Sequence, residues 1–388
     1  MSTLKVDGIR SNSASSDAIT LASDGTCTAN ITNNLSNRNL IINGAMQVAQ
    51  RSTSSTTSGY GSVDRFRPFH SGTDEAPTQA HVSVDTGTTP FSLGLKTALK
   101  ITNGNQTSGA GTADVIEFAT RLEAQDLATS GWNYTSTSSY ITLSFWVKSS
   151  VAQNFYGQLV TTDGTSQNYP FETGSLTANT WTKVTKTIPG NANLTFDNNT
   201  DKGIDIKWIM YRGTNTTGSV SLNAWAANDN SVRTPDSTST WYTTNDATFE
   251  ITGVQLEVSD HATDFEHRSF GQELALCQRY FFTVAEKGAN HSLAFGQNYN
   301  TATAFYNIIF PVRMRATPTL DQITGTNYYQ TFSNGSAVHF NEFNSVDTNT
   351  ANTQRCELRR ESLSVTQGAG NFVRYENANA EVRFTAEL

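Results

Sequence analysis

The sequence predicts an all-β protein, and three observations lead to that prediction. Charged residues make up only 15% of the 388 residues, against roughly 25% in a typical soluble protein, and Thr, Ser and Asn fill the difference. Apolar residues alternate with polar ones over several segments, as they do in half-buried strands. The 27 glycines, together with Ser and Asn, supply the turns that many short strands need.

The N-terminal 40 residues form the first of three predicted regions. They contain short β patterns over residues 4–9 and 18–28, separated by Ser- and Asn-rich turns. This leader has too few apolar side chains to fold alone, so we expect it to become ordered on a partner, including copies of itself. A disordered terminus is the alternative. The apolar residues expected to carry the attachment are Leu4, Val6, Ile9, Ile19 and Leu21.

Residues 41–268 form the second predicted region, a β-sandwich. Alternation over residues 141–148 and 181–188 predicts strands with one face toward a core. Over residues 249–258 the apolar positions change parity at Gly253, which predicts a β-bulge at that glycine.

Residues 269–388 form the third predicted region, a C-terminal β-sandwich. It begins with the only helix-like stretch, residues 271–282, where Leu274, Cys277 and Phe281 are spaced i, i+3, i+7 and predict a short connecting helix. Strand patterns return over residues 304–310 and at the end of the chain, residues 380–388. We therefore expect the last strand to be needed for the sheet of this domain.

Charge and hydropathy exclude two classes of partner. A net charge of -8 argues against a nucleic-acid binder, which needs clustered Lys and Arg. No apolar run approaches the roughly 18 residues of a membrane span, and the N-terminus lacks the apolar core of a signal peptide. We therefore expect no membrane insertion and synthesis in the cytoplasm. The three cysteines are far apart and odd in number, which favours isolated thiols.

Catalytic and metal-binding motifs are absent, so the sequence predicts neither an enzyme nor a metal site. The six histidines show no zinc-like pair spaced i, i+4. Asp197, Asn199 and Asp201 alternate as in a calcium loop, but Lys202 replaces the turn glycine and Trp208 replaces the bidentate glutamate, so this is no EF-hand. No cofactor is expected, and structural calcium bound in another geometry stays an open alternative.

Binding of a sugar needs an exposed aromatic face with amide and hydroxyl groups beside it. Aromatic residues in Thr- and Asn-rich surroundings are the candidate ligand contacts, and a half-buried position in a sheet is the alternative for each. These candidates are Trp225, Trp241, Tyr242, Tyr328 and Tyr329.

The order of several motifs resembles that in tail fibres and related structural proteins of bacteriophages, particularly those that infect marine bacteria. The matching segments, in addition to the leader, are residues 39–51, 63–66, 141–148, 251–257, 262–266, 273–280, 310–319 and 385–388. Residues 141–148 and 251–257 are similar to strands of carbohydrate-binding jelly rolls. The resemblance implies a virion-attachment segment (1–40), a jelly-roll domain like a carbohydrate-binding module (41–268), and a receptor-binding knob (269–388).

The resemblance also implies a function. We expect a homotrimeric fibre of the virion, attached to the phage tail through its N-terminus, that mediates adsorption to polysaccharide on the host surface. The alternatives are a capsid-attached fibre or decoration protein, a depolymerising tailspike enzyme, and a secreted bacterial carbohydrate-binding module. A depolymerase needs two suitably spaced carboxylates, and the sequence does not single out a pair among its 34 acidic residues.

Overall fold

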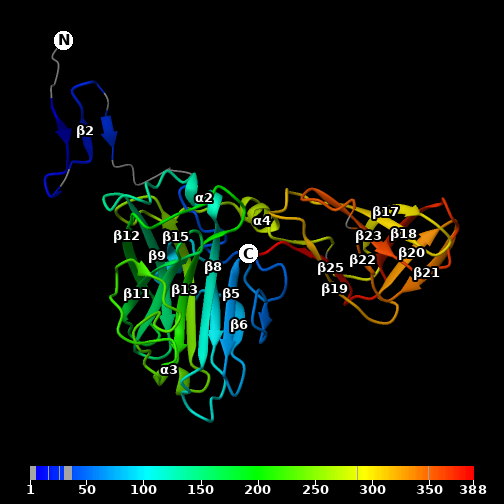
Figure 1. Ribbon diagram of the computed structural model, residues 1–388, viewed down its shortest axis with the longest axis horizontal. Helices are drawn as coiled ribbons and strands as arrows, with labels where there is room; N and C mark the ends of the chain where they lie inside the picture. Colours follow the sequence, from blue (N-terminus) through cyan, green and yellow to red (C-terminus); the bar gives the residue numbers. More distant parts are fainter. Residues whose placement is uncertain (1–5, 16, 26, 30–36, 286, 348) are drawn as a thin grey trace.

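The protein is built almost entirely of antiparallel β-sheets, as the sequence predicts. The computed structural model describes residues 6–388 apart from residues 16, 26, 30–36, 286 and 348. Figure 1 shows two β-sandwiches, the first at the centre and the second at the right. Of the described helices, none has both the length and the apolar character needed to span a bilayer. The three cysteines form no disulfide among the described residues.

The leader contains a small three-stranded sheet. Its strands β1 (Gly8–Ile9), β2 (Ile19–Leu21) and β3 (Cys27–Ala29) pair in sequence order. The candidate attachment residues Val6, Ile9 and Leu21 are exposed, and Ile19 is half-buried. Leu4 lies outside the described residues. An exposed apolar set of this kind is what a segment that packs on a partner would present, and the attachment itself stays a prediction.

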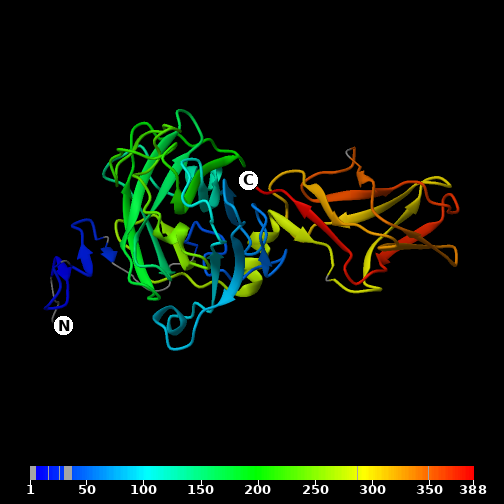
Figure 2. The same cartoon turned by 90° about the horizontal axis from the view of Figure 1, so that it is seen from below.

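The first sandwich consists of two six-stranded sheets with one core between them (Figures 1 and 2). The strands of one sheet, in spatial order, are β14 (Ala226–Ala227), β11 (Gln167–Ser175), β10 (Asn154–Thr161), β13 (Lys202–Arg212), β8 (Val115–Glu123) and β5 (Phe66–Ser71). Those of the other are β12 (Thr182–Pro189), β9 (Tyr140–Ser149), β15 (Thr248–Glu257), β7 (Thr97–Thr102), β6 (Thr78–Ser83) and β4 (Ser54–Ser55). Three one-turn helices lie in connections: α1 (Thr89–Ser92), α2 (Ala124–Ala128) and α3 (Thr240–Thr243).

Aromatic side chains fill the core of the first sandwich. Trp208 of β13 stacks on Phe118 of β8, with ring centroids 5.2 Å apart. The same indole meets Phe145 of β9, in the opposite sheet, edge to face at 5.6 Å. Burying each such side chain contributes about 1.5–3 kcal/mol, so this contact helps to hold the two sheets together.

The predicted bulge in β15 is confirmed. The register of β15 against β9 shifts between Thr252 and Gln255, and Gly253 has a φ of 61°. A Cβ atom at this position would lie 2.6 Å from Leu95 Cδ1. Glycine is therefore required here both by backbone conformation and by space.

The second sandwich packs a three-stranded sheet against a seven-stranded sheet. The small sheet contains β16 (Phe281–Thr283), β25 (Glu381–Thr385) and β19 (Thr319–Ile323). The large sheet contains, in spatial order, β21 (Ser336–Phe340), β20 (Tyr329–Ser333), β24 (Gly370–Tyr375), β17 (Ser292–Asn298), β18 (Ala304–Ile309), β23 (Arg355–Arg360) and β22 (Ser345–Val346). The final strand is the central strand of the small sheet, because it pairs with β16 on one side and with β19 on the other.

Helix α4 (Phe270–Gln278) connects the sandwiches and is shorter than the predicted stretch. It starts at a capping box formed by Ser269 and Gln272, which satisfies the first free backbone amides. Cys277 and Phe281 are buried as their spacing suggests, but Phe281 already belongs to β16 rather than to the helix.

A dense polar junction fixes the second sandwich to the first. Arg279 donates two hydrogen bonds to the buried carboxylate of Glu123, both at 2.7 Å. Arg51 and Arg65 of the first sandwich both pair with Glu387 near the chain end. The C-terminus therefore lies beside the first sandwich, as Figure 1 shows.

Candidate functional site

The outer face of the seven-stranded sheet carries the candidate site. Along β18, Ala304, Tyr306 and Ile308 point into the core, while Phe305, Asn307 and Ile309 point outward. Directly opposed residues of paired strands share a face. The outward side chains of β17 and β23 therefore lie beside those of β18.

Unusual exposure of apolar side chains distinguishes this face. Ile309, Phe295 and Tyr299 have exposed fractions of 78%, 73% and 67%, which are the highest among the large hydrophobic residues of the described chain. All three come from β17, β18 or the turn between these strands. Exposed apolar residues gathered on one surface mark a binding face more often than scattered ones do.

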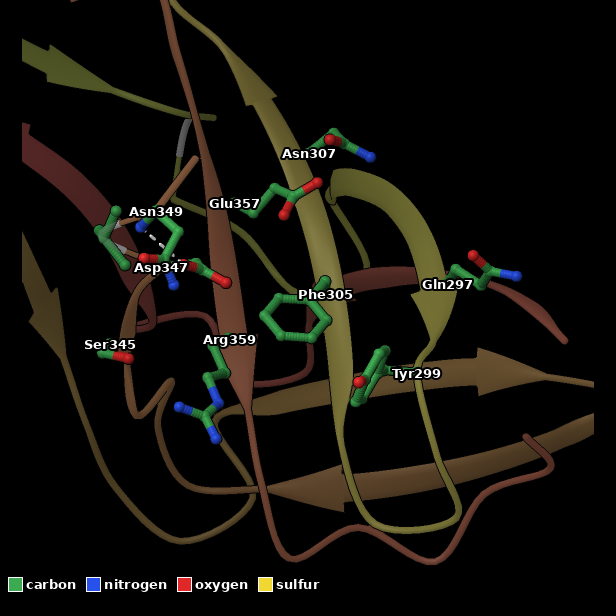
Figure 3. Close-up of a pocket in the computed structure, with 10 residues that line it drawn as sticks. Gln297, Tyr299, Phe305, Asn307, Ser345, Asp347, Asn349, Glu357 and Arg359 are labelled. Carbon is green, nitrogen blue, oxygen red and sulfur yellow. Dashed lines mark hydrogen bonds between the residues drawn. The ribbon is translucent and has the colours of Figure 1, made fainter. Parts of the chain in front are cut away.

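A groove of about 710 Å³ crosses this face. Four strands and the loop that follows β22 supply its walls. The lining residues are Gln297, Tyr299, Phe305, Asn307, Ser345, Val346, Asp347, Asn349, Glu357 and Arg359. Figure 3 shows Phe305 in the middle of this group, with Tyr299 on one side and Arg359 on the other.

Strand pairing sets the positions of the groove side chains. Phe305 lies opposite Gln297 on β17 and opposite Arg359 on β23. The Tyr299 ring meets the Phe305 ring edge to face, with centroids 5.8 Å apart. One row further along the sheet, Asn307 lies opposite Glu357. The groove thus combines an aromatic floor with amide and charged groups at fixed spacing.

Several polar groups in the groove are available to a ligand. Within the described part of the chain, neither the Asn307 amide nor the Glu357 carboxylate has a hydrogen-bond or ion-pair partner. Gln297 donates only a 3.3 Å hydrogen bond to the Gly368 carbonyl. Arg359, in contrast, is paired with Glu361. The free amide and carboxylate can accept and donate hydrogen bonds as sugar hydroxyls require.

A second set of aromatic rings continues the face beyond the groove. Phe332 of β20 stacks on Phe372 of β24 with centroids 4.8 Å apart and planes 9° from parallel. Phe295 lies 6.2 Å from Phe372. The Arg374 guanidinium covers Phe332, 4.4 Å from the ring centroid. This leaves Phe295 as the exposed ring of the set.

Two of the aromatic residues that the sequence singles out are in the core of the first sandwich. Trp241 is fully buried on α3 and donates its indole hydrogen to the Thr248 carbonyl at 3.0 Å. Tyr242 is also buried and donates to Asp114 at 2.9 Å. Burial and the neighbouring Asp114 raise the pKa of the Tyr242 phenol. These positions leave no ring face for a sugar, so a ligand contact does not fit either residue.

The other three candidates also lie outside the groove. Trp225 is half-buried, packs on Tyr169 and donates to the Pro189 carbonyl at 2.7 Å. Tyr329 is fully buried and donates to the Ile323 carbonyl at 2.7 Å. Tyr328 is half-buried against the second core. The structure therefore does not bring the five candidates together, and a half-buried or core position describes all of them.

Sequence reasoning missed the groove residues Tyr299 and Phe305. Residues 304–310 are a predicted strand, but both of its faces are rich in apolar side chains, so alternation alone does not tell which face meets water. Tyr299 lies in the β17–β18 turn, and an aromatic residue beside Asn298 and Asn300 was the available indication.

The calcium-like loop does not gather a cluster of acidic ligands in the described chain. No group of three or more His, Cys, Asp or Glu side chains is gathered there or elsewhere among the described residues. The Asp197 amide instead donates to the Asp163 carboxylate at 3.0 Å, and the Asp201 amide donates to the Asn199 side chain at 2.9 Å. Of the three side chains, Asn199 therefore stabilises a turn through its amide oxygen.

No protein-family model matches the sequence, and no curated protein matches it. Among solved structures, the N-terminal cellulose-binding domain of Cellulomonas fimi β-1,4-glucanase C is 13% identical, and the match covers 55% of this chain and 100% of that one, with a TM-score of 0.27. The family 11 carbohydrate-binding module of Clostridium thermocellum is 10% identical over 54% of this chain and 98% of that one, with a TM-score of 0.25.

A bacteriophage protein is also among the matches. The enzymatically active domain of bacteriophage CBA120 tailspike protein 4 is 10% identical, with a TM-score of 0.28. That match covers 57% of this chain but only 21% of the tailspike chain. At TM-scores this low, none of these likenesses carries information about the ligand or activity of the present chain.

Proposed function

We propose that the protein binds a glycan in the groove on the outer face of the seven-stranded sheet. The observation that carries this proposal is the exposed Tyr299 ring beside Phe305, in a groove that also holds the Asn307 amide and the Glu357 carboxylate, both without a partner among the described residues. An aromatic face stacks on the apolar face of a pyranose, while amides and carboxylates meet its hydroxyls.

The groove suits a chain of sugars better than a compact small molecule. Its lining residues extend over neighbouring strands of the sheet, and the exposed Phe295 ring lies opposite Asn307 on the same face. Each stacked sugar would bind weakly, and several copies of the protein on one particle would raise the overall affinity by avidity.

An array of bacterial surface polysaccharides, probed with the full chain, tests this proposal. Tyr299→Ala should weaken retention by about tenfold or more, as loss of a central aromatic contact does. The ring is largely exposed, so its removal should change stability by only about 0.5 kcal/mol. Phe270→Ala, which removes an exposed ring from α4, is the matched control and should bind like the wild type. Equal binding by Tyr299→Ala and the wild type would exclude the groove.

We further propose that the chain is a homotrimeric tail fibre of a phage virion, which adsorbs to the host surface. The motif order of the sequence and the exposed apolar residues of the leader support it. Light scattering should then give a mass of about three chains, whereas a monomer would contradict the fibre. Labelling in intact particles separates tail from capsid attachment: a signal confined to the head would favour a capsid-attached fibre or decoration protein.

One observation favours a second candidate function, polysaccharide cleavage. The groove holds two carboxylates, Asp347 and Glu357, and glycosidases act with a carboxylate pair. Release of reducing ends that is abolished by both Asp347→Asn and Glu357→Gln would make the protein a depolymerase. Binding without such release supports the proposed binding function.

A further inference from the structure

The charged groups around the groove are paired unevenly. Glu357 is half-buried and its carboxylate has no ion-pair partner within the described chain. Asp347 is also half-buried, and among the described residues its carboxylate accepts a hydrogen bond only from the Asn349 backbone amide, at 2.8 Å. Among the described lining residues the one cation is Arg359, whose terminal nitrogen pairs with the partly exposed Glu361 while its Nε has no hydrogen-bond partner in the described chain. Within the described chain, a ligand in the groove therefore meets two carboxylates that have no cationic partner, and one arginine that already has an anionic partner.

Another cation lies nearby but outside the groove. Arg355 is on β23, two residues before Glu357, and its side chain is exposed. It lies opposite Ile309 rather than among the lining residues. Because the Arg355 side chain is exposed, water reduces its attraction for the half-buried carboxylates, so it offsets them only in part.

We infer that the glycan taken by this groove carries no carboxylate, sulfate or phosphate groups; the inference rests on the proposed function and specifies its ligand class. An anionic sugar would place like charges together in a partly desolvated groove, where their repulsion is stronger than in water. Sugar hydroxyls instead donate to the free Glu357 carboxylate, and such charge-assisted hydrogen bonds are stronger than neutral ones.

Matched polysaccharides that differ only in charge test the inference. An acidic bacterial polysaccharide is compared with the same material after its uronate carboxylates have been reduced to alcohols, beside uncharged polysaccharides. The wild-type chain should retain the reduced form about tenfold better than the native form. Binding of uncharged glycans should change little between about 0.05 and 0.5 M salt, since no counter-charges are screened.

Two variants and a control locate the effect. Glu357→Gln removes the free carboxylate, and Glu361→Gln frees Arg359 from its partner. Both should raise binding of the native acidic polysaccharide by about tenfold. Asp264→Asn makes the same charge change at an exposed position of the first sandwich and should have no effect.

The outcomes separate the inference from the proposed function. Wild-type protein that binds the native acidic form as well as or better than the reduced form would overturn the inference while leaving glycan binding intact. No retention of any polysaccharide, acidic, reduced or uncharged, would overturn the proposed function, and the inference with it.

Discussion

Glu387 is the residue whose loss should separate the two sandwiches. Its carboxylate pairs with Arg51 at 3.0 Å and with the buried Arg65. Aromatic rings of the second sandwich cover both guanidiniums. The Tyr280 ring centroid lies 3.4 Å from the guanidinium carbon of Arg65, and the Phe281 ring centroid lies 3.6 Å from that of Arg51. Since each sandwich contributes to this cluster, its energy couples their unfolding.

The substitution Glu387→Gln keeps the size of the side chain and removes its charge. Arg65 has an exposed side-chain fraction of only 1%, so the variant leaves a buried cation without its counter-charge. Breaking a buried pair in this way costs about 3–5 kcal/mol. With a urea slope of about 2 kcal/mol/M for a domain of this size, the cost corresponds to a shift of the urea midpoint by about 1.5–2.5 M.

Two spectroscopic probes distinguish the sandwiches. All six tryptophans lie between residues 132 and 241, so tryptophan fluorescence follows the first sandwich, whereas far-UV circular dichroism follows both. In the wild type the two transitions should coincide. In Glu387→Gln the dichroism should show an earlier transition of the second sandwich. Glu342→Gln, at an exposed position of the same sandwich, is the control. Coincident and unshifted transitions in Glu387→Gln would refute the coupling.

Two further predictions concern the first sandwich. Burial raises the pKa of Asp64 to about 6, so the folded state holds this proton more tightly than the unfolded state. The free energy of unfolding should therefore fall as pH rises from about 4 to 6. Over this window the wild type should lose about 3 kcal/mol relative to the Asp64→Asn variant, which has no carboxyl group to titrate. Parallel pH profiles of the two proteins would contradict this. In Gly253→Ala, the new Cβ is strained by the positive φ and by contact with Leu95, so thermal unfolding should show a loss of about 1–3 kcal/mol of stability. The control Gly271→Ala, in α4, should lose no stability. Equal melting temperatures of the two variants would contradict the strain.

Local periodicity predicts the strands because it records which side chains alternate between core and solvent. Residues 141–148 became β9 and residues 304–310 became β18. The bulge at Gly253 was predictable as well, because one extra residue in a strand moves the apolar residues from odd to even positions of the sequence, or the reverse. These features depend only on neighbours in sequence.

The candidate site depends on contacts between distant residues and could not be predicted in the same way. Trp241 and Tyr242 stand among Thr and Asn residues, yet the Thr248 carbonyl and Asp114 bind them in the core. Glu357 becomes a groove residue only because β23 pairs with β18. The Glu387 junction likewise joins residues more than 300 positions apart.

The most direct test of glycan binding in the groove is amide hydrogen exchange of the full chain with and without a retained polysaccharide. Glycan binding in the groove should add protection to the segments that carry its lining residues, 297–307, 345–347 and 349–359, and should leave exchange in the first sandwich unchanged. Protection confined to the first sandwich, with the groove unaffected, would contradict it.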